Sequence, residues 1–202
     1  MPSVIERAST GRAKCRACGQ AIARGDERFG EALPNAYGEG DSLFWFHLPC
    51  AACARPEAVL PVLGQSALSS RERKPLEALA QAGIAQGRLC RILRAERASS
   101  GRARCRHCRE LIEQGAWRLS LQIFEDGRFS PIGTIHATCA VGYFGSEPEL
   151  ARLTLPNNQL QPDELSEVVR LMREGAAHSL HIKGLAKAGT EDAELESTRK
   201  SS

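Results

Sequence analysis

The sequence contains no apolar run that approaches the roughly 18 residues needed to cross a bilayer. Residues 1–10 also lack the charged and apolar regions of a secretory leader. We therefore expect a soluble, intracellular protein without a membrane partner, in a compartment where disulfides are rare. The richness in Ala, Arg and Gly favours a bacterial protein in the cytoplasm or on the nucleoid; a eukaryotic one would be nuclear.

The sequence also lacks the residues of a recognisable catalytic centre. It shows no carboxylate cluster, no open metal site and no glycine-rich nucleotide-binding loop. We therefore predict that the protein is not an enzyme. A DNA-end-processing enzyme, or an accessory to one, stays open as an alternative.

A frame of three cysteines and one histidine is present twice. It consists of Cys15, Cys18, His47 and Cys50, and again of Cys105, Cys108, His136 and Cys139. The central spacer is 28 residues in the first frame (19–46) and 27 in the second (109–135). The segment that leads into the first two cysteines is repeated as well: ERASTGRAKCRAC at 6–18 corresponds to ERASSGRARCRHC at 96–108. The chain is therefore internally duplicated.

Thiolate and imidazole groups at these spacings are typical zinc ligands, since zinc accepts both in a closed tetrahedron. We predict two zinc ions, one in each frame. Four protein ligands leave no position for an activated water, so each site is expected to stabilise the fold rather than to catalyse a reaction. The alternative is that the cysteines form disulfides or remain buried thiols.

Three residues near the frames have no counterpart in the repeat. Cys53 follows Cys50 closely enough to compete as a ligand, whereas Cys90 stands apart. Both are expected to be small buried residues. His107 occupies the position of Ala17, and we expect it to face solvent or DNA.

The duplication divides the 202 residues into two small units. We predict an α+β fold of two tandem zinc-stapled units, each an antiparallel β-hairpin or sheet with a Cys₃His site and a C-terminal helix. The first unit is assigned to residues 1–86 and the second to 95–178. A linker at 87–94 joins them, and the polar, aperiodic residues 179–202 are expected to form a flexible tail.

Periodicity places the elements within each unit. Alternation of apolar and polar residues predicts strands at Phe29–Leu33, Leu43–His47, Trp117–Ile123 and Gly133–His136, with a long exposed loop inside each pair. Helices are predicted at Lys74–Ala82 and Asp163–Glu174, ended by Gly83 and Gly175. The stripe of Leu165, Val168, Val169 and Met172 is expected to pack in the core.

Basic residues concentrate around the second frame. Arg91 to Glu110 contains seven arginines against two glutamates, although the whole chain has a formal charge of only +3. A charge run alone is as often a solvated face as a nucleic-acid-binding surface.

Gly-Arg-Ala-x-Cys-x₂-Cys, an arginine ten residues beyond the second cysteine, and Trp-x-His-x₂-Cys resemble the PARP-type zinc finger. The second unit matches this pattern less closely at its closure. That family occurs in poly(ADP-ribose) polymerase and in a nick-sensing DNA ligase, and it recognises DNA strand breaks rather than base sequence. The resemblance implies a DNA-break-binding protein in DNA repair or damage signalling, with repair enzymes as further partners.

The resemblance also implies which residues contact DNA. Phosphate contacts are expected at Arg12, Arg28, Arg102 and Arg118, together with Arg16 and Arg106 inside the two cysteine motifs. Side chains that stack on the exposed base pair are expected at Tyr37 and Leu43 in the first unit and at Phe124, Phe129 and Ile132 in the second. Gly38 and Ser42 stand where the family has apolar residues, so the second unit is expected to be the stronger end-binder.

Two alternatives limit these assignments. The arginines could instead form surface salt bridges with nearby glutamates. The zinc scaffold could also serve an RNA-binding or protein-interaction module, which the acidic residues Glu31, Glu39 and Asp41 favour for the first unit.

Overall fold

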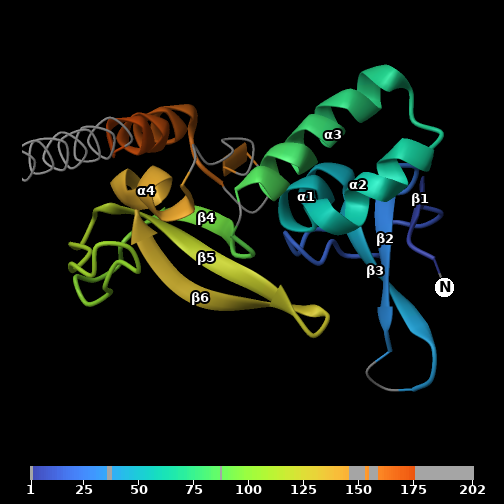
Figure 1. The fold of residues 1–202 in the computed structure, drawn as a ribbon, viewed down its shortest axis with the longest axis horizontal. Helices are drawn as coiled ribbons and strands as arrows, with labels where there is room; N and C mark the ends of the chain where they lie inside the picture. Colours follow the sequence, from blue (N-terminus) through green and yellow to red (C-terminus); the bar gives the residue numbers. More distant parts are fainter. Residues whose placement is uncertain (1, 36–37, 87, 146–152, 155–158, 176–202) are drawn as a thin grey trace, which may run out of the picture.

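The protein consists of two α+β units, each built on a three-stranded antiparallel sheet (Figure 1). The computed structural model describes residues 2–35, 38–86, 88–145, 153–154 and 159–175. The first sheet is formed by β1 (Val4–Arg7), β2 (Glu27–Pro34) and β3 (Asp41–His47), and the second by β4 (Arg91–Arg97), β5 (Trp117–Glu125) and β6 (Arg128–His136). The predicted fold class is confirmed, and each unit carries one Cys₃His cluster.

The first strand of each sheet was not expected. β1 and β4 lie in the segment before each cysteine motif. β1 pairs with β2 and β4 with β5, the strand that follows the motif in each unit. Their sequences, VIER and RILRAER, are too short and too charged to show a clear two-residue alternation. Because β4 begins at Arg91, it takes in the second half of the segment assigned to the linker.

The long exposed loop predicted between the paired strands is absent from the second unit and is reduced to residues 35–40 in the first. β2 and β3 pair continuously from Arg28↔His47 to Pro34↔Asp41. β5 and β6 pair as far as Glu125↔Arg128, and only Asp126 and Gly127 make the turn. Their φ angles of 50° and 73° are both positive, as a two-residue type I′ hairpin requires. In the second unit the spacer is therefore mostly strand.

Three helices complete the first unit: α1 (Leu48–Ala54), α2 (Pro56–Gln65) and α3 (Ser70–Ala85). They lie together on one side of the first sheet (Figure 1). The predicted helix Lys74–Ala82 is real but too short. Its true start is marked by a capping box, in which Ser69 and Glu72 bond reciprocally to each other's backbone N–H. Gly83 does not end the helix; it lies buried within it.

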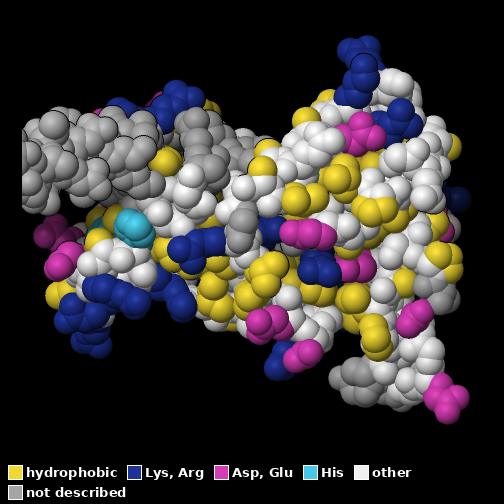
Figure 2. Space-filling view, in the orientation of Figure 1, with side chains coloured by type: hydrophobic (Ala, Val, Ile, Leu, Met, Phe, Trp, Pro, Cys, Tyr) yellow, Lys and Arg dark blue, Asp and Glu magenta, His cyan; other side chains and the backbone are white. Residues whose placement is uncertain are grey.

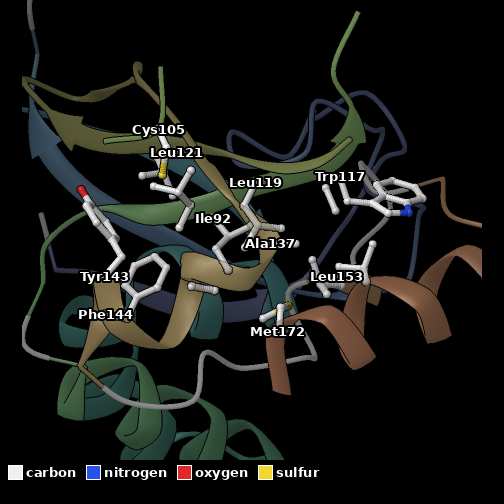
Figure 3. Close-up of a cluster of buried hydrophobic side chains, with 14 of the residues drawn as sticks. Ile92, Cys105, Trp117, Leu119, Leu121, Ala137, Tyr143, Phe144, Leu153 and Met172 are labelled. Atoms are coloured by element: carbon white, nitrogen blue, oxygen red, sulfur yellow. The ribbon is translucent and has the colours of Figure 1, made fainter. Parts of the chain in front are cut away.

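The second unit also has helical segments among its described residues. After β6 come the 3₁₀ turn η1 (Ala137–Cys139) and α4 (Ala140–Phe144), and residues 162–175 form a further helix. The stripe predicted on that helix does pack in the core, with Val168 and Met172 fully buried (Figure 3). A Cβ atom at Gly175 would lie 1.7 Å from the Thr138 carbonyl oxygen, so only glycine allows the helix to approach the η1 turn.

The tip of the β5–β6 hairpin contacts the first unit (Figure 1). The Phe129 ring meets Phe46 edge-on at a centroid distance of 6.4 Å and meets Phe124 at 4.8 Å. The Arg55 guanidinium lies 3.9 Å from the centroid of Phe124 and donates to Glu31 at 2.5 Å. The two units therefore share a small apolar contact. Arg55, which covers Phe124, is itself paired with Glu31 of the first unit.

A second contact between the units is an ion pair. Arg91, buried at the start of β4, donates to Glu57 of α2 at 2.8 Å and adds a second link between the units.

Glu31 is only 4% exposed, whereas Glu39 and Asp41 are exposed. Within the described residues, no helix is both long enough and apolar enough to span a membrane.

Replacing Phe129 by Ala should destabilise the protein by about 2 kcal/mol, because a half-buried ring that packs on the core of the other unit is lost. Urea unfolding measures this change. Leu89→Ala, which truncates a side chain that is 76% exposed, is the control. If the two variants have the same free energy of unfolding, the contact between the units contributes nothing to stability.

Candidate metal centres and the surface around them

The two Cys₃His clusters are built from the same three parts. Cys15 and Cys18 lie in a tight turn closed by the bridge Lys14↔Ala21, and Cys105 and Cys108 lie in a turn closed by Arg104↔Leu111. These turns, residues 14–21 and 104–111, are called the first and second knuckles below. The other four ligands come from the end of the third strand and the helical turn after it: His47, Cys50, His136 and Cys139. In each cluster the four ligand atoms lie within 4.8 Å of one another.

The geometry of each cluster fits a tetrahedral zinc ion. His47 Nδ1 lies 3.4 Å from Cys18 Sγ and 3.8 Å from Cys50 Sγ. The corresponding distances from His136 Nδ1 to the sulfurs of Cys108 and Cys139 are 3.4 and 3.8 Å. Zinc bonds of about 2.0 Å to nitrogen and 2.3 Å to sulfur place such atoms roughly 3.6 Å apart. Each cluster can therefore hold one zinc ion, and the eight residues are those that the spacing predicts.

Backbone groups orient the ligands. His47 Nε2 lies 3.2 Å from the Ala21 carbonyl oxygen, and His136 Nε2 lies 3.2 Å from that of Leu111. A proton on Nε2 leaves Nδ1 free for the metal, so the knuckle carbonyl selects the tautomer that binds zinc. The backbone N–H of each histidine also donates to the sulfur of Cys15 or Cys105 at 3.4 Å.

The thiols titrate unequally without metal. A hydrogen bond with Cys50 lowers the pKa of Cys15 to about 5, and the same hydrogen bond raises the pKa of Cys50. Burial opposes ionisation of Cys105, but backbone hydrogen bonds lower its pKa to about 7. Burial, with the charges of Cys105 and Cys108, raises the pKa of Cys139 to about 12. Zinc must therefore displace protons from each cluster, and its affinity falls as the pH is lowered.

Cys53 and Cys90 are buried, as expected, and belong to neither cluster. Cys90 Sγ lies 3.7 Å from the Tyr143 hydroxyl. His107 is exposed at the second knuckle, where its ring meets Tyr143 edge-on at 6.4 Å.

Two of the arginines expected to contact phosphate, Arg28 and Arg118, form ion pairs within the protein. Arg28 is 7% exposed, donates to Glu6 at 2.6 Å and stacks on Trp45 with its Cζ 3.6 Å from the ring centroid. Arg118 donates to Glu96 at 2.9 Å. In both sheets the arginine and the glutamate are directly opposed across two strands. The salt-bridge alternative therefore describes Arg28 and Arg118 in this structure.

The glutamate of the second pair is held ionised. Burial alone would raise the pKa of Glu96, but hydrogen bonds from Ser120 and Arg118 and the charge of Arg94 outweigh it and lower that pKa. A carboxyl group with a lowered pKa stabilises the fold above its unfolded-state pKa and loses this contribution as the pH falls through the folded-state value. The arginine–glutamate pair is thus part of the strand pairing at neutral pH.

The remaining predicted arginines are exposed and unpaired. Arg12, Arg16, Arg102 and Arg106 have no carboxylate within ion-pair distance in the described part of the chain. The Arg16 guanidinium lies 4.5 Å from the centroid of Phe44, and Arg106 donates to the Ile132 carbonyl oxygen. Figure 2 shows Lys and Arg side chains gathered at the lower left, over the second unit, with an exposed histidine on the same face.

The second knuckle carries larger groups than the first. His107, Arg109 and Leu111 stand where the first knuckle has small or flexible residues, Ala17, Gly19 and Ala21. Arg109 has a φ of 70°, close to the 76° of Gly19. A non-glycine residue in this left-handed region costs about 1 kcal/mol or more. The repeat already sets His107 against Ala17, and the same residue-by-residue alignment sets Arg109 against Gly19 and Leu111 against Ala21.

The predicted stacking residues are dispersed. Phe124 and Phe129 lie at the contact between the units, and Tyr37 lies outside the described residues. Leu43 is a half-buried residue of β3. Ile132 of β6 packs against the core of the second unit. Among the four that the structure describes, Phe124 and Phe129 lie together, with ring centroids 4.8 Å apart.

No family model matches the chain. The relation to PARP-type zinc fingers therefore rests on the repeated residues and their spacing. The two Cys₃His clusters are consistent with tandem zinc fingers.

Cys139→Ser should reduce bound zinc from two ions to one per chain and unfold the second unit, because zinc binding supplies folding energy on the order of 10 kcal/mol. Metal analysis after dialysis, combined with circular dichroism, measures both effects. Cys90→Ser removes a buried sulfur outside the clusters and should retain both ions. Two ions bound by the Cys139 variant would contradict its role as a ligand.

Proposed function

We propose that this is a zinc-dependent DNA-binding protein of the PARP-type zinc-finger kind, which recognises DNA strand breaks without itself acting as an enzyme. The observation that carries the proposal is a set of exposed arginines that recur in and beside both knuckles and have no carboxylate partner among the described residues: Arg12, Arg16, Arg102 and Arg106. The hydrogen bond from the ligand histidine to the knuckle carbonyl connects this surface to the metal site.

Guanidinium groups suit phosphate because their planar N–H donors match two phosphate oxygens at once. Zinc holds the knuckle backbone in place before DNA arrives, so less conformational entropy is lost on binding. Arg28 and Arg118 contribute indirectly, since their pairs with Glu6 and Glu96 hold together the strands that flank each knuckle. Two knuckles provide two attachment points along one DNA molecule.

Phosphate contacts alone bind any duplex, so break recognition requires a contact with the base pair that a break exposes. An apolar side chain can pack on a base pair only where a break has interrupted the stacking of neighbouring base pairs, because intact duplex covers the base faces. The repeated Gly-Arg-Ala-x-Cys-x₂-Cys text supports this reading through its resemblance to break-sensing fingers. Bound at a break, the protein would mark the damage or recruit repair enzymes.

Competition binding tests the proposal directly. The zinc-loaded protein is offered a nicked duplex and a covalently closed circular duplex of the same sequence, at one salt concentration. Preference for the nicked DNA would support break recognition, and equal affinity would contradict it. A single-stranded RNA competitor that displaces both DNAs would instead assign the surface to RNA.

Arg102→Ala should weaken DNA binding and lower the slope of log K against log salt by about one, because one phosphate contact is lost. Fluorescence anisotropy titrations at several salt concentrations measure the slope. Arg7→Ala is the matched control, since Arg7 is exposed but already paired with Glu27 at 2.8 Å. An unchanged slope in the Arg102 variant would remove this residue from the interface.

Arg109→Gly should raise the melting temperature or leave it unchanged, since glycine adopts a φ of 70° without strain. The same change should weaken DNA binding several-fold, because a cationic side chain leaves the second knuckle. Differential scanning calorimetry and anisotropy on one preparation measure the two effects. Reduced stability together with unchanged DNA affinity would show that the arginine serves the fold.

A further inference from the structure

One exposed apolar side chain lies on a knuckle. Three large hydrophobic residues are exposed in the described part of the chain: Ile84, Leu89 and Leu111. Ile84 belongs to the end of α3, and Leu89 belongs to the connection between α3 and β4. Leu111, which is 48% exposed, is the last residue of the second knuckle.

The backbone of Leu111 is held by the metal site. Its carbonyl oxygen accepts from the ligand His136, and its bridge with Arg104 closes the knuckle. The next residue, Ile112, is fully buried in the core and donates its N–H to the Ala103 carbonyl at 2.8 Å. Leu111 therefore presents its side chain from a rigid backbone.

Two arginines lie close to this position, in a segment that also carries the exposed carboxylates Glu110 and Glu113. Arg104 is the bridge partner of Leu111, and its Nη1 donates to the Arg109 carbonyl oxygen at 3.3 Å, which brings the two arginines together. Both are exposed, and neither has a carboxylate partner among the described residues. An apolar side chain bordered by unpaired guanidinium groups matches the edge of a DNA end, where a base face lies beside phosphates.

The first knuckle lacks this feature. Ala21 holds the corresponding position and accepts the equivalent hydrogen bond from His47 at 3.2 Å. Its backbone is therefore held in the same way, but its methyl group presents little apolar surface. Each unit has its own Cys₃His cluster and its own exposed arginines, and the two units differ in this side chain.

The aromatic residues of the second unit are engaged elsewhere. Phe129 packs on Phe46 of the first unit, and Phe124 is covered by Arg55. Stacking of either ring on a base would require the hairpin tip to leave the first unit. Leu111 can contact DNA without any such separation.

We infer that Leu111 is the residue that distinguishes a strand break from intact duplex, by packing against the base exposed at the break while the arginines of the second knuckle hold the flanking phosphates. Leucine is among the apolar residues that proteins insert at unstacked base steps. The inference rests on the proposed function. It makes binding directional, because the second unit contacts the break and the first contacts continuous duplex.

Leu111→Ala should lower the ratio of affinities for nicked and closed circular DNA by about five-fold, at the lower edge of the effect of an aromatic ring stacked on a base, because leucine offers a smaller apolar surface. Affinity for the closed DNA should stay unchanged, because the arginines remain. Leu89→Ala is the matched control, since it truncates an exposed leucine outside both knuckles. Zinc content of two ions per chain is verified for each variant.

Ala21→Leu provides the reciprocal test and should raise the same ratio. If the wild-type protein prefers nicked DNA and Leu111→Ala keeps that preference, the inference is wrong while the proposed function stands. An equal loss of affinity on both DNAs would also overturn it, because Leu111 would then be a general contact. A wild-type protein with no preference would overturn the proposed function and this inference together.

Discussion

The Cys₃His cluster of each unit ties together three segments of the chain, two of which, the knuckle and the third strand, also share a backbone hydrogen bond. The knuckle supplies two sulfurs, the third strand ends on the histidine, and the following turn supplies the last sulfur. The histidine also binds the knuckle carbonyl through its second nitrogen, so metal, strand and knuckle are fixed relative to one another. Because units of this size bury little apolar surface, a metal that ties these segments together supplies energy that the core cannot.

Duplication preserved both structural and surface residues, and only the structure separates them. Glu6 and Arg28 recur as Glu96 and Arg118, and each pair spans two strands of its sheet. Arg12 and Arg16 recur as Arg102 and Arg106, and these side chains face solvent. Both groups repeat equally well in the sequence. What differs is the distance to a carboxylate, which depends on strand register.

The two units have diverged around their common zinc core. The first carries α2 and α3, whereas the second carries a long hairpin whose tip packs on Phe46 and Arg55 of the first. This contact orients the knuckles relative to each other and occupies aromatic rings that would otherwise be exposed. The second knuckle has Arg109 where the first has Gly19, in a left-handed conformation that only glycine adopts without strain.

The sequence by itself determined the duplication, the eight ligands, the α+β class and the apolar stripe of helix 162–175. Each is a matter of spacing or period, and these are local properties. The Ser69–Glu72 capping box and the Asp126-Gly127 turn are equally local signals, which mark the start of α3 and the tip of the second hairpin. Tertiary structure alone decided that β1 and β4 complete the sheets, that Arg28 and Arg118 are paired, and that Phe129 contacts the other unit. These depend on strand partners and on packing between segments far apart in the chain, which residue periodicity does not specify.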